Sequence, residues 1–214
     1  MIHYARPARA LAASLAFLAG FVDATGFLAL GGFFVSFMSG NSTRLGVSLG
    51  EGSPEALLAA GLIVAFVIGV IAASLLRRTL HKARQAAVLC LVAGLLVAAA
   101  ILHAAGASWA CGLVMAMAMG AENGVFERNG EVSIGLTYMT GALVKFGQRL
   151  AATLMGARTF AWAPYLMLWA SLVAGAFAGA FAFRFIGAHG LWLAATAAAV
   201  LSVVSLRLGD PEDA

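Results

Sequence analysis

The sequence predicts an all-α, polytopic transmembrane helix bundle made of two inverted repeats, and three observations lead to this prediction. Hydrophobic residues make up 63% and charged residues 10% of the 214 positions, against about 45–50% and about 25% in soluble domains. Apolar runs long enough to cross a bilayer recur from residue 11 to residue 207. The second half of the chain also repeats motifs of the first half in the same order. We therefore expect residues 1–214 to form one integral membrane domain.

The repeat is clearest at a short motif that occurs once in each half. FMSG at residues 37–40 aligns with YMTG at residues 138–141. Before the motif, Gly20 and Asp23 align with Gly120 and Asn123. After the motif, small residues recur at every fourth position and an arginine follows, as Ala65, Gly69, Ala73 and Arg78, and again as Ser171, Gly175, Gly179 and Arg184. We place the two repeats at about residues 11–104 and 108–207.

Each repeat contains four helical elements. The first is an apolar span, at residues 11–29 and again at 108–125. Arg6 and Arg9 before the first span imitate a signal peptide, but a related span recurs in mid-chain, so we expect the helix to be retained. A shorter, Gly-interrupted polar segment follows at 33–49 and 133–150. Two more apolar helices close each half, at 56–76 and 86–104, then at 162–183 and 190–207. Strand-like alternation is absent, so we expect no sheet.

The distribution of Lys and Arg predicts the topology, because cytoplasmic loops are enriched in them. If the N-terminus is cytoplasmic and the polar segments do not cross fully, six crossings leave only Arg44 and Arg184 of the 13 Lys and Arg residues outside. Eight crossings would export either the basic loop of residues 77–84 or, when flipped, a set that includes Arg149 and Arg158. We expect six spans in the bacterial inner (cytoplasmic) membrane, with both termini cytoplasmic. Three crossings per repeat then require the repeats to have opposite orientations.

The two short polar segments are the candidate pathway for a solute. Broken backbone at membrane depth is tolerated where protein or water satisfies it, so we interpret them as broken or re-entrant helices that line a path. The alternative is that small and hydroxyl side chains only let helices pack closely. The candidate residues in these segments are Ser39, Gly40, Asn41, Ser42 and Arg44, and, in the second half, Thr140, Gly141, Lys145 and Gln148.

Polar side chains in the first span of each repeat complete the candidate site, at Asp23, Glu122 and Asn123. An ionised carboxylate in a lipid span costs about 3 kcal/mol or more unless it faces a cavity or a partner. Asp23 lies well inside its span, so we expect it to bind or relay a proton or cation. Glu122 lies near the predicted cytoplasmic end of the fifth crossing, where exposure to the interface is the alternative.

Two cations occupy aligned positions in the polar segments, Arg44 and Lys145. One interpretation makes them anchors for an anionic substrate. The alternative is ordinary snorkelling of long side chains to the headgroups.

Catalysis, cofactors and metal ions are not expected. The residues Gly46 to Gly50 match the G-x-S-x-G form of a nucleophile elbow, but that elbow needs a preceding strand, and the aligned copy replaces Ser48 with Arg149. The histidines show no ligand spacing, and the basic residues sit between apolar runs, so we expect neither a metal site nor nucleic-acid binding. The expected partners are the lipid bilayer and a small-molecule or ion substrate, and a homo-oligomer stays open.

The GFVDA run at residues 20–24, the GGFFVSFMSGN run at 31–41 and the TYMTG run at 137–141 resemble the YoaK-like family of small bacterial membrane proteins. The similarity covers nearly the whole chain. It implies a six-span protein of a group regarded as transporters and catalogued as a domain of unknown function. By this resemblance, the family's characteristic motif positions are Asp23, Ser39, Gly40, Asn41, Thr140 and Gly141, none with a role that carries over.

From these observations we expect a permease that moves a small solute or ion between the two polar segments, coupled to a proton or cation through Asp23. The alternative is a membrane scaffold or assembly factor that transports nothing.

Overall fold

The computed structural model describes residues 6–80, 82–128, 131–157 and 160–208, and within these ranges the chain is almost entirely helical. Arg158, which the topology prediction uses, lies outside them. The α-helices of the described residues are α1 (Arg6–Ala29), α2 (Met38–Glu51), α3 (Glu55–Thr79), α4 (Arg84–Ala104), α5 (Ser108–Glu122), α6 (Met139–Leu154), α7 (Ala163–Ile186) and α8 (Leu191–Leu208). Short 3-10 helices η1 (Asn123–Phe126) and η2 (Gly187–Gly190) continue α5 and connect α7 to α8.

The observed helices match the predicted elements in order, but the two polar segments are helical only in their second part. Both segments begin as non-helical loops, and their helices start only at Met38 and Met139. The end of α2 follows from a glycine: Gly52 adopts φ 65°, and the N–H of Ser53 donates to the carbonyl of Ser48 at 2.8 Å. This is a common helix ending, and Pro54 then leads into α3.

The expectation of no strands was wrong at one place. Two short antiparallel strands, β1 (Glu127–Arg128) and β2 (Glu131–Val132), follow η1, with Glu127 opposite Val132. The backbone N–H and the hydroxyl of Ser133 both donate to the carbonyl of Phe126, at 2.8 Å and 2.6 Å, and close this hairpin. Strands of two residues are too short to give an alternating pattern. The available signal was Asn129-Gly130, a typical hairpin turn dipeptide, which lies outside the described residues.

Glycines bring helices of the two halves into direct backbone contact. A Cβ at Gly20 of α1 would collide with the Leu172 carbonyl of α7, and a Cβ at Gly175 of α7 would collide with the Phe17 carbonyl of α1. The numbering increases in the same direction along both helices, so α1 and α7 run parallel. The small-residue stripe of α7 therefore joins the two halves of this chain.

The same kind of contact pairs α3 with α5. Gly69 of α3 lies against the carbonyl of Met117, and Gly120 of α5 lies against the carbonyl of Phe66. These two helices also run parallel. Because small residues at a crossing let backbones approach closely, van der Waals contact and weak polar contacts are gained along the whole crossing.

The outer surface of the bundle is apolar. Four helical stretches of the described residues are long and apolar enough to cross a membrane: Arg6–Ala29, Glu55–Thr79, Arg84–Ala104, and Ala163–Leu208, which contains α7, η2 and α8. Large apolar side chains such as Leu57 and Phe177 are 72% exposed. Water would disfavour so much exposed apolar surface, so the fold is that of a helical membrane bundle.

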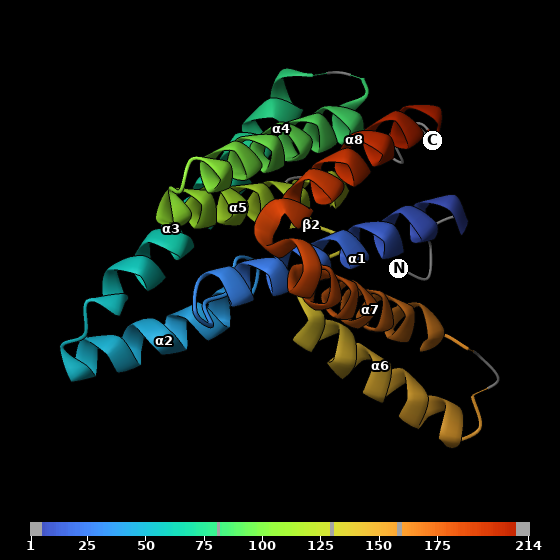
Figure 1. Ribbon diagram of the computed structural model, residues 1–214. Helices are drawn as coiled ribbons and strands as arrows, with labels where there is room; N and C mark the ends of the chain where they lie inside the picture. Colours follow the sequence, from blue (N-terminus) through green and yellow to red (C-terminus); the bar gives the residue numbers. More distant parts are fainter. Residues whose placement is uncertain (1–5, 81, 129–130, 158–159, 209–214) are drawn as a thin grey trace.

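Several helix ends and connections lie toward two ends of the molecule, whereas the connections from α1 to α2 and from α7 to α8 lie nearer its centre (Figure 1). The start of α1, the end of α3 with the start of α4, the end of α6 and the end of α8 lie toward one end, on the right. The turn from α2 to α3 and the connection from α4 to α5 lie toward the other end, on the left. The helices α2 and α6 diverge from the centre and form the outer arms of the fold.

Candidate substrate cavity

The loop before α2 is held in place by two buried or half-buried side chains. Asp23 of α1 accepts hydrogen bonds at Oδ1 from the backbone N–H groups of Val35 and Ser36, at 2.9 Å and 2.8 Å. Asn41, which is fully buried, accepts from the N–H of Phe34 at 3.1 Å and donates to the carbonyl of the same residue at 2.6 Å. The Asn of the Met-Ser-Gly-Asn motif, Asn41, thus fixes the loop that precedes the motif.

A comparable connection stands in the second half. Thr137 Oγ1 lies 3.1 Å from Asn123 Nδ2 and 3.2 Å from Asn123 Oδ1, and both residues are buried. Asn123 Nδ2 also donates to the carbonyl of Met119 at 3.0 Å. Asp23 aligns with Asn123 and Ser36 with Thr137 in the sequence. Each half therefore ties its first span to the residue two positions before its polar helix.

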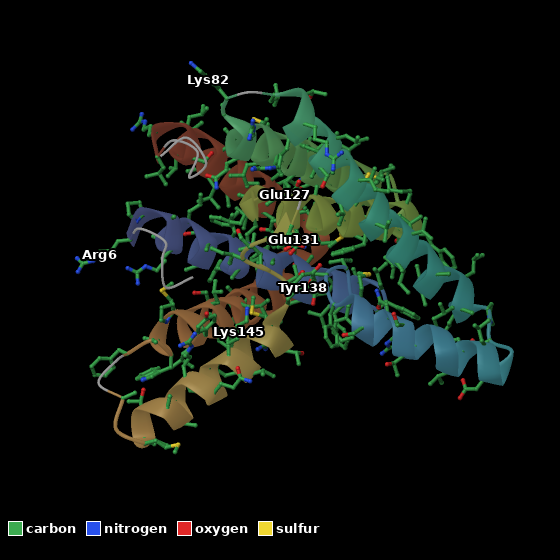
Figure 2. The ribbon with its side chains drawn as sticks, turned by 180° about the vertical axis from the view of Figure 1, so that it is seen from behind. Arg6, Lys82, Glu127, Glu131, Tyr138 and Lys145 are labelled. Atoms are coloured by element: carbon green, nitrogen blue, oxygen red, sulfur yellow. The ribbon has the colours of Figure 1, made fainter. Side chains whose placement is uncertain are left out.

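The two motifs meet at a cavity of about 370 Å³, which we call the central cavity. Its walls come from the loop and first turn of α2, the loop and first turn of α6, and the middle of α3. The lining residues are Ser36, Phe37, Met38, Ser39, Ile63, Phe66, Val67, Thr137, Tyr138, Met139, Thr140 and Gly141. Figure 2 shows Tyr138 near the centre of the molecule, and Lys145 farther toward the end that carries Arg6.

The motif helices start at the central cavity and run toward opposite ends of the fold. Helix α2 begins beside the middle of α3 and ends at the turn that starts α3. Helix α6 begins at the same cavity and runs along the first part of α7, where Lys145 and Tyr165 line a smaller cavity of about 210 Å³. Both helices are short, with 14 residues in α2 and 16 in α6, and only Asn41 and Ser48 of α2 and Ala142 of α6 are buried.

The predicted site residues lie at different distances from the central cavity. Ser39, Thr140 and Gly141 line the central cavity, whereas Asp23, Asn41 and Asn123 hold its walls from behind. Gly40 lies under the ring of Phe37, which a Cβ would approach to 2.5 Å. The remaining predicted residues lie outside the cavity lining: Ser42, Arg44, Glu122, Lys145 and Gln148.

The cations at aligned positions do not meet at one site. Arg44 lies over the ring of Phe33 at 4.7 Å, and Lys145 lies 6.0 Å from the ring centre of Tyr165. Each cation therefore contacts an aromatic ring of its own half. The hydroxyl of Ser42 donates to the carbonyl of Met38 at 2.8 Å, within its own helix.

Glu122 lies elsewhere than the sequence indicated. It is fully buried, and neither carboxyl oxygen has a hydrogen-bond partner among the described residues. Its neighbour Ala121 lies against Gly69, in the middle of α3, so Glu122 is level with the centre of that helix. The sequence left exposure of Glu122 at the membrane interface as an alternative, and its complete burial excludes that alternative.

Some residues that line the central cavity were not part of the site predicted from the sequence. Ser36 and Thr137 were signalled by their alignment one position before the FMSG and YMTG motifs. Ile63, Phe66 and Val67 of α3 gave no signal, because they are ordinary apolar residues of an apolar span. A larger cavity of about 600 Å³ lies between α1, α7 and α8, but its walls are apolar apart from two serines, Ser14 and Ser171. Paired polar groups favour the central cavity as the candidate site.

Long apolar helices, a lipid-facing surface and polar groups gathered inside define a multi-pass helical membrane protein. Within that class, the chain belongs to the DUF1275 family, described as a protein of unknown function, whose model matches residues 11–204. It is similar to the UPF0700 transmembrane protein RA0705 of Rhizobium meliloti (strain 1021), with 38% identity over 199 residues, 93% of this chain and 86% of the relative. No solved structure matches. The family resemblance stated from the sequence is confirmed.

Proposed function

We propose that this protein is a permease that moves a small solute or ion through the central cavity. The observation that carries the proposal is the composition of the cavity wall, to which both halves contribute the same motif. Ser36 to Ser39 and Thr137 to Thr140 are aligned position by position and line one cavity. Binding at the centre of the bilayer, between two related halves, is the arrangement used by many secondary transporters.

Inverted repeats are part of this proposal, and the helix contacts support them. The contact of Gly20 with Leu172 and that of Gly120 with Phe66 join aligned residues. A two-fold rotation that exchanges the halves would therefore superimpose the α1–α7 pair on the α5–α3 pair. Such an axis, lying in the membrane plane, gives the repeats opposite orientations.

Six spans are proposed as well, formed by α1, α3, α4, α5, α7 and α8. The parallel directions of α1 with α7 and of α3 with α5 agree with this count. The side chains of Arg6 and Lys82 lie toward the same end of the molecule, as a common cytoplasmic side requires (Figure 2). In this topology α2 and α6 each return from the centre to one membrane face, as re-entrant helices.

Asp23 is the group through which we propose a proton or cation acts on the cavity. As a carboxylate it makes two charge-assisted hydrogen bonds to the loop that forms the wall. Neutralisation by a proton, or competition by a cation, weakens these bonds and lets the loop move. Ion binding at Asp23 would thereby change the shape of the site that holds the solute.

The proposal is tested by filling the cavity. Ser39→Trp, at the lining, should abolish solute uptake into vesicles, whereas Ser42→Trp, one helical turn along α2 and outside the lining, should retain it. Candidate solutes are screened with the wild-type protein in vesicles, and empty vesicles give the background. Equal uptake by both variants would remove the central cavity from the pathway.

A scaffold without transport is the second candidate, favoured by the exposed faces of α2 and α6. These faces carry polar groups such as Thr43 and Gln148 that another protein could cover. A scaffold would tolerate Asp23→Asn and Ser39→Trp as long as its partner still co-purified. We propose no catalysis: the G-x-S-x-G match lies inside α2, where Ser48 is buried, and not at a strand-to-helix turn.

A further inference from the structure

Glu122 occupies a position at which the fold needs no acid. The alignment that pairs Gly20 with Gly120 pairs Glu122 with Val22, and both residues have no exposed surface. Val22 belongs to the apolar core of the first half. A side chain kept for packing alone would be apolar in the second half too, so the carboxyl group calls for another explanation.

Within the described residues, neither carboxyl oxygen of Glu122 has a hydrogen-bond partner. The charged and titratable side chains on the helices packed against α5 are Arg6, Arg9 and Asp23 on α1, Glu55, Arg77 and Arg78 on α3, and Arg84, Cys90 and His103 on α4. Among these, Arg77 donates to the carbonyls of Val125 and Glu127. A buried carboxylate without a partner is strongly disfavoured, whereas the neutral acid is tolerated.

A short path connects this carboxyl group to the central cavity. The next residue, Asn123, is hydrogen-bonded to Thr137, and Thr137 lines the cavity. Glu122 itself is the last residue of α5, just before the helix tightens into η1. A shift of the loop that contains Thr137 would therefore be transmitted through Asn123 to the start of η1, next to the carboxyl group of Glu122.

From this geometry we propose that Glu122 is a proton-binding site, occupied in the conformation described and emptied when the end of α5 opens. On release, the carboxyl O–H bond breaks, the proton passes to water on one side of the membrane, and the carboxylate is solvated by that water. On return, the carboxylate takes a proton from water on the other side. The return of the proton from the other side of the membrane rests on the proposed function, because there the proton cycle accompanies passage of the solute.

Infrared spectroscopy tests the site without any knowledge of the solute. The purified protein, in vesicles of phosphatidylethanolamine and phosphatidylglycerol, should show the carbonyl stretch of a protonated carboxylic acid at neutral pH. The band should lose the intensity of one carboxyl group in Glu122→Gln and keep it in Glu55→Gln, a matched change at an exposed glutamate. In the wild type it should also decline as the pH is raised. A band of unchanged intensity in Glu122→Gln, or one that does not titrate in the wild type, would overturn the inference.

A second variant keeps the test independent of folding. Glu122→Val copies the aligned residue Val22 and should raise the thermal unfolding temperature while removing the same band. A band retained in Glu122→Val would also overturn the inference. The infrared test and the uptake test can fail independently. If the band behaves as expected but Ser39→Trp and Ser42→Trp show equal uptake, the proton site stands and the central cavity is rejected as the path.

Discussion

The carboxylate of Asp23 accepts a hydrogen bond of 2.8 Å from the backbone N–H of Ser36, the residue at which the wall of the central cavity begins. A residue in the first span thus fixes the geometry of the polar segment that follows it. The corresponding pair in the second half, Asn123 and Thr137, uses neutral groups for the same purpose. Because only the pair in the first half carries a charge, substitutions of Asp23 separate the role of the charge from that of the hydrogen bonds.

Asp23→Asn should fold and be produced at the wild-type level, because an amide oxygen still accepts the two backbone hydrogen bonds and asparagine already serves at the aligned position 123. Its coupled solute uptake should be lost, since the amide carries no charge to neutralise. Uptake in vesicles with and without a proton gradient measures this. Wild-type uptake and coupling in Asp23→Asn would contradict a coupling role.

Asp23→Leu should behave differently from Asp23→Asn. It strands the N–H groups of Val35 and Ser36, at about 1–3 kcal/mol for each buried donor left unsatisfied. We expect a lower unfolding temperature and a disordered α2 loop, read as faster proteolysis between α1 and α2. If Asp23→Leu is as stable as Asp23→Asn, the two hydrogen bonds do not hold the loop.

Glycines at the helix crossings should tolerate no side chain. Gly120→Ala places a Cβ against the carbonyl of Phe66, so we expect a large loss of stability. The matched change Gly147→Ala in α6 has no atom within 4 Å of the new Cβ and should be neutral or stabilising by about 0.5–1 kcal/mol. Thermal unfolding in detergent compares the two, and equal melting temperatures would argue against the close crossing of α3 and α5.

Thr137→Val should weaken the tie between α5 and the second motif. The variant removes the hydroxyl bonded to Asn123 but retains the shape of the side chain. We expect a loss of about 1–3 kcal/mol in the free energy of unfolding, since the buried amide loses a partner. Thr137→Ser, which keeps the hydroxyl, is the control. A variant Thr137→Val as stable as Thr137→Ser would show that the bond contributes little.

Much of this architecture was visible in the sequence, for identifiable reasons. Long apolar runs and the aligned small residues, such as Gly69 and Gly175, predicted the helices and their close packing, because lipid and helix crossings both impose strong constraints on side-chain type. The FMSG and YMTG motifs predicted a shared polar site, and in the fold both line one cavity.

Other features depended on distances that no sequence pattern encodes. Arg44 and Lys145 are aligned, yet each turns to an aromatic ring of its own half, because a side chain's direction depends on its neighbours in space. The sequence left the burial of Glu122 open, because burial depends on how α5 is offset along α3, and that offset follows from contacts such as Gly69 with Met117. The α3 wall of the cavity had no signal at all.

The most direct measurement of the central claim is the reactivity of single cysteines toward a membrane-impermeant thiol reagent. Cys90→Ala and Cys111→Ala supply a background without cysteine, to which Ser39→Cys, Thr140→Cys or Phe177→Cys is added. Both positions line the central cavity. If the cavity is a solute path, water reaches it, so in vesicles the cysteines at positions 39 and 140 should react. The cysteine at position 177 should not, although Phe177 is 72% exposed, because lipid covers it. Unreactive cysteines at both 39 and 140, in folded variants, would contradict a solute path between the two motifs.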